Sequence, residues 1–210
     1  MAQLKTGSTV GGLLIANNPM THAGDMIYGG VSGIGARMPY GSQGQIIEMG
    51  AANTPGWVSK GLVQIKHYAS GAYQHITASC AEDDTVMQKT EGDEWSTLAI
   101  TPQNIANLLL IDVNVMAAMD QEAIMGLFQD DLANALTVTY AAKGYTGQQR
   151  GNLYLRYYMV AGTITTITFK VRVARRASAG TWVRINGSSA GAGIFGGVAN
   201  STITIFEMRG

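Results

Sequence analysis

One segment of this sequence alternates polar and apolar side chains with the period of a β-strand, and it limits the fold more than any other feature. Residues 166–173 read Thr-Ile-Thr-Phe-Lys-Val-Arg-Val. Because successive side chains of a strand point to opposite faces of a sheet, this order separates the apolar residues from the polar ones. The segment predicts a half-buried strand whose core face carries Ile167, Phe169, Val171 and Val173.

Strand-like segments continue from residue 62 almost to residue 208. Most are short apolar or alternating runs bounded by glycine, asparagine and other turn-forming residues. Seven or more strands within one domain indicate a sandwich or a barrel. We therefore expect an all-β fold with strands at residues 62–69, 107–117, 123–129, 152–160, 166–173, 180–186 and 202–208.

Residues 120–136 also fit a second interpretation. Ile124, Leu127, Phe128 and Leu132 recur at spacings close to the period of an α-helix, and Asp120 is a possible N-cap. A short helix in this region therefore competes with the strand at 123–129, and the sequence leaves both open.

The first 61 residues differ in composition from the rest of the chain. They contain about half of the 27 glycines and three of the four prolines, Pro19, Pro39 and Pro55. Strands of three to five residues between flexible turns do not offset the entropy lost on ordering them, so this segment is not expected to bury a core alone. We expect a glycine- and proline-rich, mostly irregular segment at 1–61 that packs on another surface, and one domain at 62–210.

The charge balance excludes several classes of partner. Lys plus Arg and Asp plus Glu are both 14, so the net charge is zero. Proteins that bind nucleic acid usually carry a basic excess that neutralises phosphates, so neither nucleic acid nor an anionic membrane surface is an expected partner. No apolar run approaches the ~20 residues of a membrane-spanning helix or the pattern of a signal peptide. We expect a protein that is made in a cytoplasm and inserts into no membrane.

Two short motifs match catalytic or cofactor patterns by spacing alone. Residues 187–191, Gly-Ser-Ser-Ala-Gly, match a nucleophile elbow, but all three histidines precede them and no helix pattern follows. Residues 191–196, Gly-Ala-Gly-Ile-Phe-Gly, match a dinucleotide fingerprint, but a strand pattern follows where the cofactor needs a helix. We expect a glycine-rich loop here, no cofactor and no enzymatic activity.

Histidine and acidic residues give only weak metal patterns. His67 and His75 lie near a predicted strand, and acidic groups follow at 82–84 and 91–94. Two histidines without a tight third ligand are more often surface or core residues, and the single cysteine, Cys80, cannot build a zinc site. We expect no metal, with calcium binding by an acidic loop as the alternative.

The only basic concentration lies around the alternating strand and the segment after it. Arg172 and Arg176 share one face of a strand and Arg175 the other, so these residues and Arg184 form no continuous patch. The expected roles are solvated strand ends and ion pairs between subunits. Binding of an acidic glycan or a partner protein is the alternative.

Three tyrosines in the segment 152–160 suggest contacts between copies of the chain. The strand period places Tyr154 and Tyr158 on one face and Tyr157 on the other. Aromatic residues at strand spacing belong more often to a core or a subunit interface than to a ligand platform. We assign Tyr154, Tyr157 and Tyr158 to a subunit interface.

The succession of motifs after residue 62 is informative as a whole. Leu-Val-Gln-Ile-Lys at 62–66 is followed by Trp-Ser-Thr-Leu-Ala-Ile-Thr-Pro at 95–102, Gly-Leu-Phe-Gln-Asp-Asp at 126–131 and Trp-Val-Arg-Ile-Asn-Gly at 182–187, before the closing strand. This order resembles the jelly-roll heads of bacteriophage fibre and capsid-surface proteins, which are similar to the heads of complement and tumour necrosis factor.

Residues 1–61 resemble phage virion proteins independently. Asn-Pro-Met-Thr at 18–21, Ala-Gly-Asp-Met-Ile-Tyr-Gly-Gly at 23–30 and Pro-Gly-Trp-Val at 55–58 are similar to the short linking modules that precede such heads. The resemblance supplies no catalytic residue and no defined receptor pocket.

The resemblance implies a homotrimeric jelly-roll head and a place on the virion surface. We expect a capsid decoration protein or short head fibre that contacts the major capsid protein or another virion protein through residues 1–61. A tail fibre or tail-tip adhesin is the alternative, with a host glycan or surface protein bound at loops 142–151 or 187–197. The residues expected to attach the protein to the particle are Leu13, Leu14, Ile15, Met26, Ile27, Tyr28 and Trp57.

Overall fold

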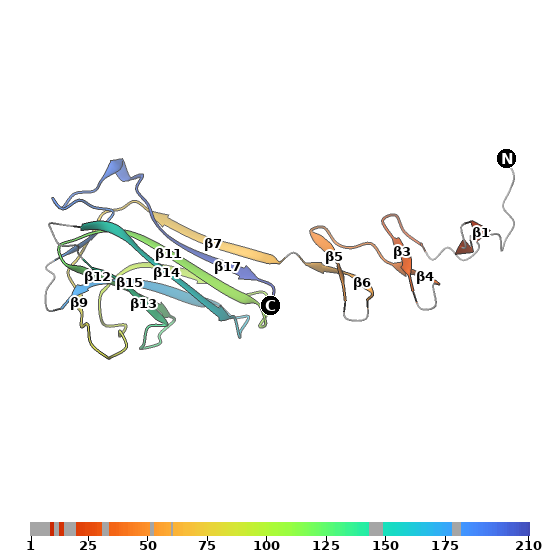
Figure 1. The fold of residues 1–210 in the computed structure, drawn as a ribbon, viewed down its shortest axis with the longest axis horizontal. Helices are drawn as coiled ribbons and strands as arrows, with labels where there is room; N and C mark the ends of the chain where they lie inside the picture. The colour runs from red at the N-terminus through yellow and green to blue at the C-terminus, as the bar shows by residue number, and fades with distance from the viewer. Residues whose placement is uncertain are drawn as a thin grey trace. The chain divides into compact units, whose positions relative to one another are not determined.

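Strands form almost all of the regular secondary structure in the described part of the chain (Figure 1). The computed structural model describes residues 9–10, 13–14, 20–30, 34–50, 53–59, 61–142, 149–177 and 182–210. Internal contacts divide the chain into one unit at Met1–Gly61 and a second at Leu62–Gly210, which we call the head. In the described ranges no helix is long and apolar enough to cross a membrane.

The head contains two sheets, and the long strands of each pair with their neighbours in antiparallel orientation. The first sheet places β7 next to β17, β17 next to β11 and β11 next to β14, with two short strands extending it at one end. The bounds of these strands are β7 Leu62–Ser70, β8 Gln74–Ile76, β11 Leu108–Met119, β14 Gln149–Val160, β16 Val183–Ile185 and β17 Ser201–Met208.

The second sheet has the order β10-β15-β12-β13, and a short strand, β9, pairs in parallel with the end of β15. The bounds of its strands are β9 Ser79–Cys80, β10 Asp93–Ile100, β12 Glu122–Gln129, β13 Thr137–Ala142 and β15 Ile167–Arg176.

The connections between the long strands identify the fold as a jelly roll. Along the chain the long strands alternate between the two sheets, except that β12 and β13 pair as neighbours in the second sheet. The first strand of the head, β7, pairs with the last, β17. Eight strands wound in this way form the double-sheet jelly roll. The expected all-β jelly-roll sandwich is confirmed.

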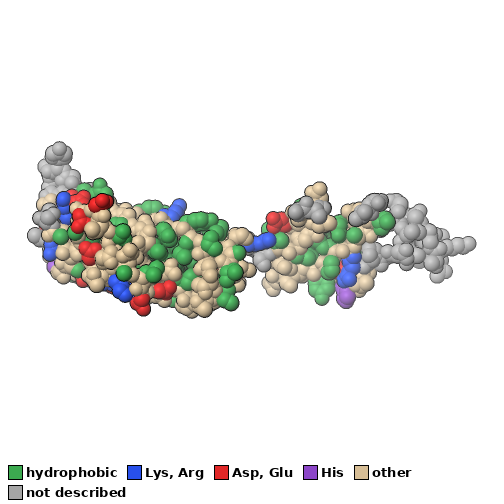
Figure 2. All heavy atoms as spheres, turned by 90° about the horizontal axis from the view of Figure 1, so that it is seen from below, with side chains coloured by type: hydrophobic (Ala, Val, Ile, Leu, Met, Phe, Trp, Pro, Cys, Tyr) green, Lys and Arg blue, Asp and Glu red, His purple; other side chains and the backbone are tan. Residues whose placement is uncertain are grey.

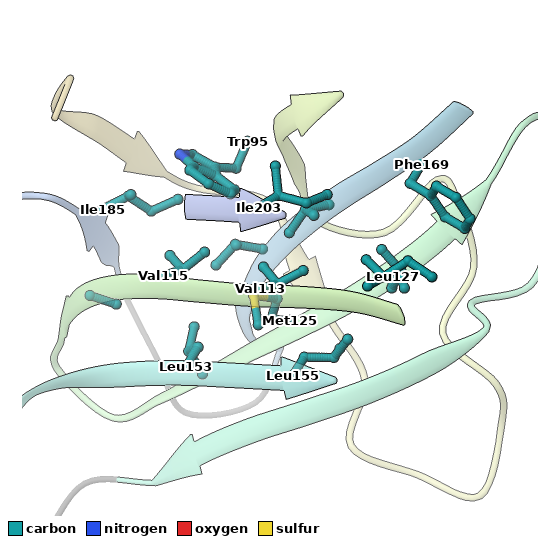
Figure 3. Close-up of a cluster of buried hydrophobic side chains, with 14 of the residues drawn as sticks. Trp95, Val113, Val115, Met125, Leu127, Leu153, Leu155, Phe169, Ile185 and Ile203 are labelled. Atoms are coloured by element: carbon teal, nitrogen blue, oxygen red, sulfur yellow. The ribbon is translucent and has the colours of Figure 1, made fainter. Parts of the chain in front are cut away.

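The core lies between the two sheets (Figure 3). The core face predicted for β15 is confirmed, because Ile167, Phe169, Val171 and Val173 are each at most 1% exposed. Alternate residues of β11, including Val113, face them from the first sheet. Burying a side chain of this size stabilises the folded state by about 1.5–3 kcal/mol, so the head contains its own stabilising core.

The alternative helix at residues 120–136 is wrong, and the competing strand is correct. Residues 122–129 form β12, which pairs with both β13 and β15. Its second face is also covered, because Ile124 and Phe128 pack with Cys80 and Met87 in a separate small cluster outside the sandwich. A strand that is buried on both faces carries apolar residues at consecutive positions, and these positions imitate a helical spacing.

The first unit consists of short antiparallel hairpins between turns. The strands pair as β1 Thr9–Val10 with β2 Leu13–Leu14, β3 Met26–Gly29 with β4 Gly35–Met38, and β5 Gln45–Met49 with β6 Pro55–Ser59. Among the residues of this unit whose burial is described, only Asp25 and Met38 are buried. The described residues of this unit therefore form short ordered strands and no hydrophobic core.

Candidate interaction surface

One end of the outward face of the first sheet is apolar where a sandwich is usually polar. The strand register aligns Tyr158, Leu110, Phe206 and Ile65 in one row across β14, β11, β17 and β7. An antiparallel sheet with one solvated face normally alternates apolar residues inward and polar residues outward. This row breaks that rule on all four strands.

A second row at the end of the same sheet is also apolar. It aligns Val160, Leu108, Met208 and Leu62. Val160 is 54% exposed and Tyr158 is 56% exposed. In the view of Figure 2, hydrophobic side chains lie at the surface of the head beside charged ones. We call the two rows together the outer apolar face: Leu62, Ile65, Leu108, Leu110, Tyr158, Val160, Phe206 and Met208.

Three polar side chains next to these rows form hydrogen bonds with one another. Arg156 donates hydrogen bonds to the Asp112 carboxylate from Nε at 3.1 Å and from Nη2 at 2.5 Å, and the Tyr154 hydroxyl donates to the same oxygen at 2.9 Å. Burial and the bond to Asp112 raise the pKa of Tyr154, so its phenol stays protonated. The charges of Asp112 and Arg156 compensate each other. A partner can therefore cover this sheet without burying an unpaired charge of either residue.

The three tyrosines assigned to a subunit interface do not lie together. Tyr154 and Tyr158 are exposed on the outward face of β14. Tyr157 faces the interior and packs against the core. Tyr154 and Tyr158 are therefore exposed on the outward face and Tyr157 is not, because neighbouring residues of a strand point in opposite directions. The assignment of the three tyrosines to a subunit interface stays a prediction.

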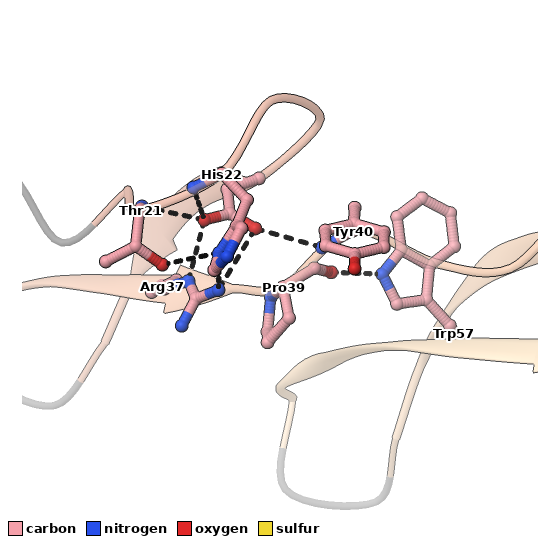
Figure 4. A network of polar contacts seen from close by, with 7 residues as sticks. Thr21, His22, Arg37, Pro39, Tyr40 and Trp57 are labelled. Atoms are coloured by element: carbon pink, nitrogen blue, oxygen red, sulfur yellow. Dashed lines mark hydrogen bonds and ion pairs between the residues drawn. The ribbon is translucent and has the colours of Figure 1, made fainter.

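The first unit is organised around a buried carboxylate (Figure 4). The Asp25 side chain is fully buried and accepts hydrogen bonds from the backbone N–H groups of Thr21, His22 and Tyr40 and from the Arg37 guanidinium, whose Nε lies at 2.8 Å. The bond from Arg37 is the largest influence, and with the backbone donors it holds the pKa of Asp25 far below its usual range although burial opposes this. Asp25 thereby joins the turn before β3 to β4.

The apolar residues expected to attach the protein are only partly described. Met26, Ile27 and Tyr28 in β3 and Trp57 in β6 are half-buried. The Trp57 ring lies against Gly41 and donates from Nε1 to the Pro39 carbonyl at 2.5 Å. Leu13 and Leu14 form β2, but their side chains lie outside the described part, as does all of Ile15.

Sequence reasoning missed other apolar residues of this unit. Ile46, Ile47 and Met49 on β5 and Ile34 and Tyr40 in the turns are all at least 45% exposed. Their only sequence signal is an apolar residue in a short run between glycines, which is also found in ordinary turns.

Four arginines of the head contact acidic side chains, a backbone carbonyl or an aromatic ring. Arg176 forms ion pairs with Glu82 at 2.7 Å and with Glu122 at 2.9 Å, and Arg172 pairs with Glu94 at 3.3 Å. Arg175 donates to the Thr77 carbonyl, and Arg184 stacks over the Trp182 ring at 4.0 Å. These ion pairs lie within one chain, and ion pairs between subunits stay a prediction.

The motifs considered for chemistry do not converge. The His67 ring forms a hydrogen bond with the Thr204 hydroxyl on the outward face of the first sheet, whereas His75 lies on β8. In the motif at 187–191, the Ser189 carbonyl accepts a hydrogen bond from Arg184. Over the described ranges, no group of three or more His, Cys, Asp or Glu residues is arranged to hold a metal ion. Residues 187–197 form the expected glycine-rich loop, with one short 3-10 turn at Phe195–Gly197. The part of loop 142–151 at residues 143–148 lies outside the described residues.

Comparison with solved structures finds viral shell proteins at low similarity. The chain is similar to infectious bursal disease virus VP2 in a subviral particle, with 13% identity and a TM-score of 0.29 over 79% of this chain and 42% of that one. It is also similar to the T13 particle of that virus, with 11% identity and a TM-score of 0.30 over 80% of this chain and 41% of the other. The chain thus spans less than half of these solved chains.

A comparison with curated protein sequences finds no significant match. A family model does match. The model of the Pgp3 C-terminal domain covers residues 79–210, which is most of the head and more than half of the whole chain. The match is to this family and not to a phage family, so the phage part of the resemblance stays an expectation. The chain belongs to the Pgp3 C-terminal domain family.

Proposed function

We propose that this protein is a non-enzymatic structural protein of a virus particle, in which three heads associate through the outer apolar face and residues 1–61 attach the trimer to the shell. The observation that carries the proposal is the pair of apolar rows on the outward face of the first sheet. The copy number of three and the virion location come from the sequence resemblance, and the self-association comes from the surface.

The outer apolar face has the composition of a subunit interface. The cores of such interfaces are rich in aromatic and aliphatic side chains and poor in charge. Leu62, Ile65, Tyr158 and Val160 are each about half exposed in one chain, which is unfavourable in water. A second copy that covers this face would remove these side chains from solvent. A closed ring of three copies would cover it on every chain.

The first unit supports the attachment role. Its described hairpins bury little, and Ile34 and Met49 are 72% and 59% exposed. Isolated two-stranded hairpins are marginal in water, so a surface that covers these side chains would stabilise the unit. Three copies held together by the heads would present three such segments to a particle at once, which strengthens binding through multivalency.

Co-sedimentation with undecorated capsids tests this function. We expect the full-length protein to pellet with capsids and a protein of residues 62–210 to remain in the supernatant while keeping the same number of copies. Failure of the full-length protein to pellet, or equal pelleting of the shortened one, would contradict the attachment role of residues 1–61.

A host-binding adhesin is the second candidate, and one loop favours it. Phe195 in the loop before β17 is 71% exposed and has a positive φ of 50°, which is an unfavourable conformation for a non-glycine residue. Val198 beside it is 78% exposed. Binding of residues 62–210 to host cells, lost on Phe195→Ala and accompanied by no capsid binding, would favour the adhesin.

A further inference from the structure

A pocket of about 510 Å³ lies on the outward side of the second sheet, away from the face assigned to self-association. Its sheet side is formed by Ile124 of β12 and by Val138 and Tyr140 of β13. The segment after β9 forms its other side with Cys80, Val86 and Met87. Its volume is within the range of about 300–1,000 Å³ that is typical of sites for small molecules.

The walls of this pocket are fixed by the fold. The segment that contains Met87 is bound to the region after β12 through backbone bonds from Lys89 to Ala133 and from Ala135 to Met87. Gly126 leaves the space that the Met87 sulfur occupies over the sheet, because a Cβ there would lie 2.7 Å from that sulfur. The pocket is therefore held open by its surroundings and can receive a ligand without a large rearrangement.

The lining combines apolar side chains with negative charge. Glu82, Asp83 and Glu122 belong to the lining, and none of its residues in the described part of the chain is Lys or Arg. Arg176 pairs with both glutamates from beside the pocket, so it offsets one of three formal negative charges. Hydrogen bonds from Thr85 lower the pKa of Asp83, which keeps this carboxylate ionised at neutral pH.

We propose that this pocket binds a small amphiphilic amine, with the apolar part of the ligand against Ile124, Val138 and Met87 and its ammonium group near the carboxylates. A cation gains favourable Coulomb energy beside a net negative rim, and the exposed ring of Tyr140 offers a cation–π contact. A fatty acid of the same length would place a carboxylate next to Glu82 and Glu122 and would be repelled. The proposal is independent of the virion role, because no residue of the outer apolar face lines the pocket.

Calorimetric titration of the full-length protein with decylammonium, decanol and decanoate tests the proposal, because these probes share one chain length and differ in charge. All titrations are made below the concentrations at which the probes aggregate. We expect one saturable site per chain for decylammonium, with an affinity about tenfold higher than for decanol and no measurable binding of decanoate. Equal affinity for decanoate, or no binding of decylammonium, would overturn the proposal.

Matched variants locate the site. Val138→Trp fills the pocket and is expected to weaken decylammonium binding at least about tenfold, whereas Ile164→Trp places the same ring at another exposed position and leaves binding unchanged. Glu82→Gln is expected to reduce the preference for the amine over decanol, and Asp131→Asn, which removes a charge outside the pocket, is not. Binding that is unchanged in both Val138→Trp and Glu82→Gln would contradict the location.

The alkylation rate of the single cysteine, Cys80, tests the location of the ligand without a variant. Burial raises the pKa of the Cys80 thiol to about 11, so its alkylation is expected to be slow at neutral pH. Bound decylammonium is expected to slow alkylation of Cys80 further, with the concentration dependence seen in calorimetry. An unchanged alkylation rate at saturating decylammonium would place the ligand elsewhere.

Discussion

At the scale of single residues, Glu207 illustrates how the head holds a charge in its interior. The residue is fully buried and accepts hydrogen bonds from Gln64 and Asn107 side chains at 2.5 Å each and from the Gln103 backbone at 2.7 Å. Burial alone would raise the pKa of Glu207, but these donors together lower it below its ordinary value. Glu207 thus joins β17 to β7 and to the segment before β11.

A glutamine at this position keeps one acceptor oxygen and replaces the other with an amide nitrogen, which cannot accept. We expect Glu207→Gln to reduce the free energy of unfolding by about 1–3 kcal/mol at neutral pH, because the amide nitrogen would face donors that need an acceptor. Chemical denaturation monitored by tryptophan fluorescence measures this loss. Asp131→Asn, at a side chain that is 92% exposed, is the control and should change stability little.

The same residue predicts a pH dependence. Because folding lowers its pKa, the contribution of Glu207 is complete above the ordinary value of 4.5 and is lost as the pH falls through the lowered folded value. The stability difference between the wild type and Glu207→Gln should therefore shrink as the pH falls below about 4.5. A difference that stays constant from pH 7 into the acid range would contradict this role.

Asp25 plays the corresponding part in the first unit. Asp25→Asn retains one acceptor oxygen but loses the charge that binds Arg37 and the second acceptor used by the backbone donors. We expect amide hydrogen exchange in residues 20–40 to accelerate, with no change in the head. Ile34→Thr, at a side chain that is 72% exposed in the same unit, is the control. Unchanged exchange in Asp25→Asn would show that the hairpin does not depend on this carboxylate.

At the scale of strands, the sequence was informative where one face of a strand is buried and the other is solvated. β15 has such faces, and its alternation predicted its core residues correctly. β12 is covered on both faces, so its pattern was ambiguous between strand and helix. The covering segment comes from residues 80–91, which no local pattern connects to β12.

Two long strands of the second sheet were not predicted, each for a physical reason. The register of β10 shifts between Glu94 and Ser96, and this irregularity breaks the alternation on which the prediction depends. In β13 the apolar residues Val138 and Tyr140 point outward into the pocket and threonines occupy the alternate positions. The usual pattern is thus reversed, and a sequence alone does not reveal the pocket that causes it.

A glycine before β10 determines how this strand begins. Gly92 has a φ of +72°, and a Cβ at this position would lie 2.8 Å from the Val173 carbonyl oxygen on the neighbouring β15. Gly162 has a similar φ of +67° but no atom within 4 Å of a Cβ. Both positions therefore require a residue that tolerates a positive φ, but only Gly92 also lacks the space for a side chain.

Alanine at the two glycines separates these effects. We expect Gly162→Ala to reduce the free energy of unfolding by about 1–2 kcal/mol, which is the cost of a left-handed conformation. Gly92→Ala should cost more, because the backbone of β15 must also move. Thermal or chemical denaturation measures both. Equal losses would show that the contact with Val173 does not contribute.

At the scale of the whole molecule, the fold class could be predicted from the sequence, but the interaction surface could not. The tyrosines of β14 were recognised as interface candidates from one strand. The outer apolar face, however, also requires Ile65, Leu110 and Phe206, which the register brings beside Tyr158 from three other strands. Such alignment is a property of the folded sheet, so the sequence pattern of each strand shows only one part of it.

The central claim is that the heads associate through this face, and the molar mass of the protein in solution tests it most directly. Light scattering after size-exclusion chromatography is expected to give three times the 22.2 kDa chain mass for the wild type and for Val198→Lys, which changes an exposed valine outside the face. Val160→Lys places a charge in the outer apolar face and is expected to give folded single chains. A wild type that is a single chain, or a Val160→Lys protein that keeps three copies, would contradict the account.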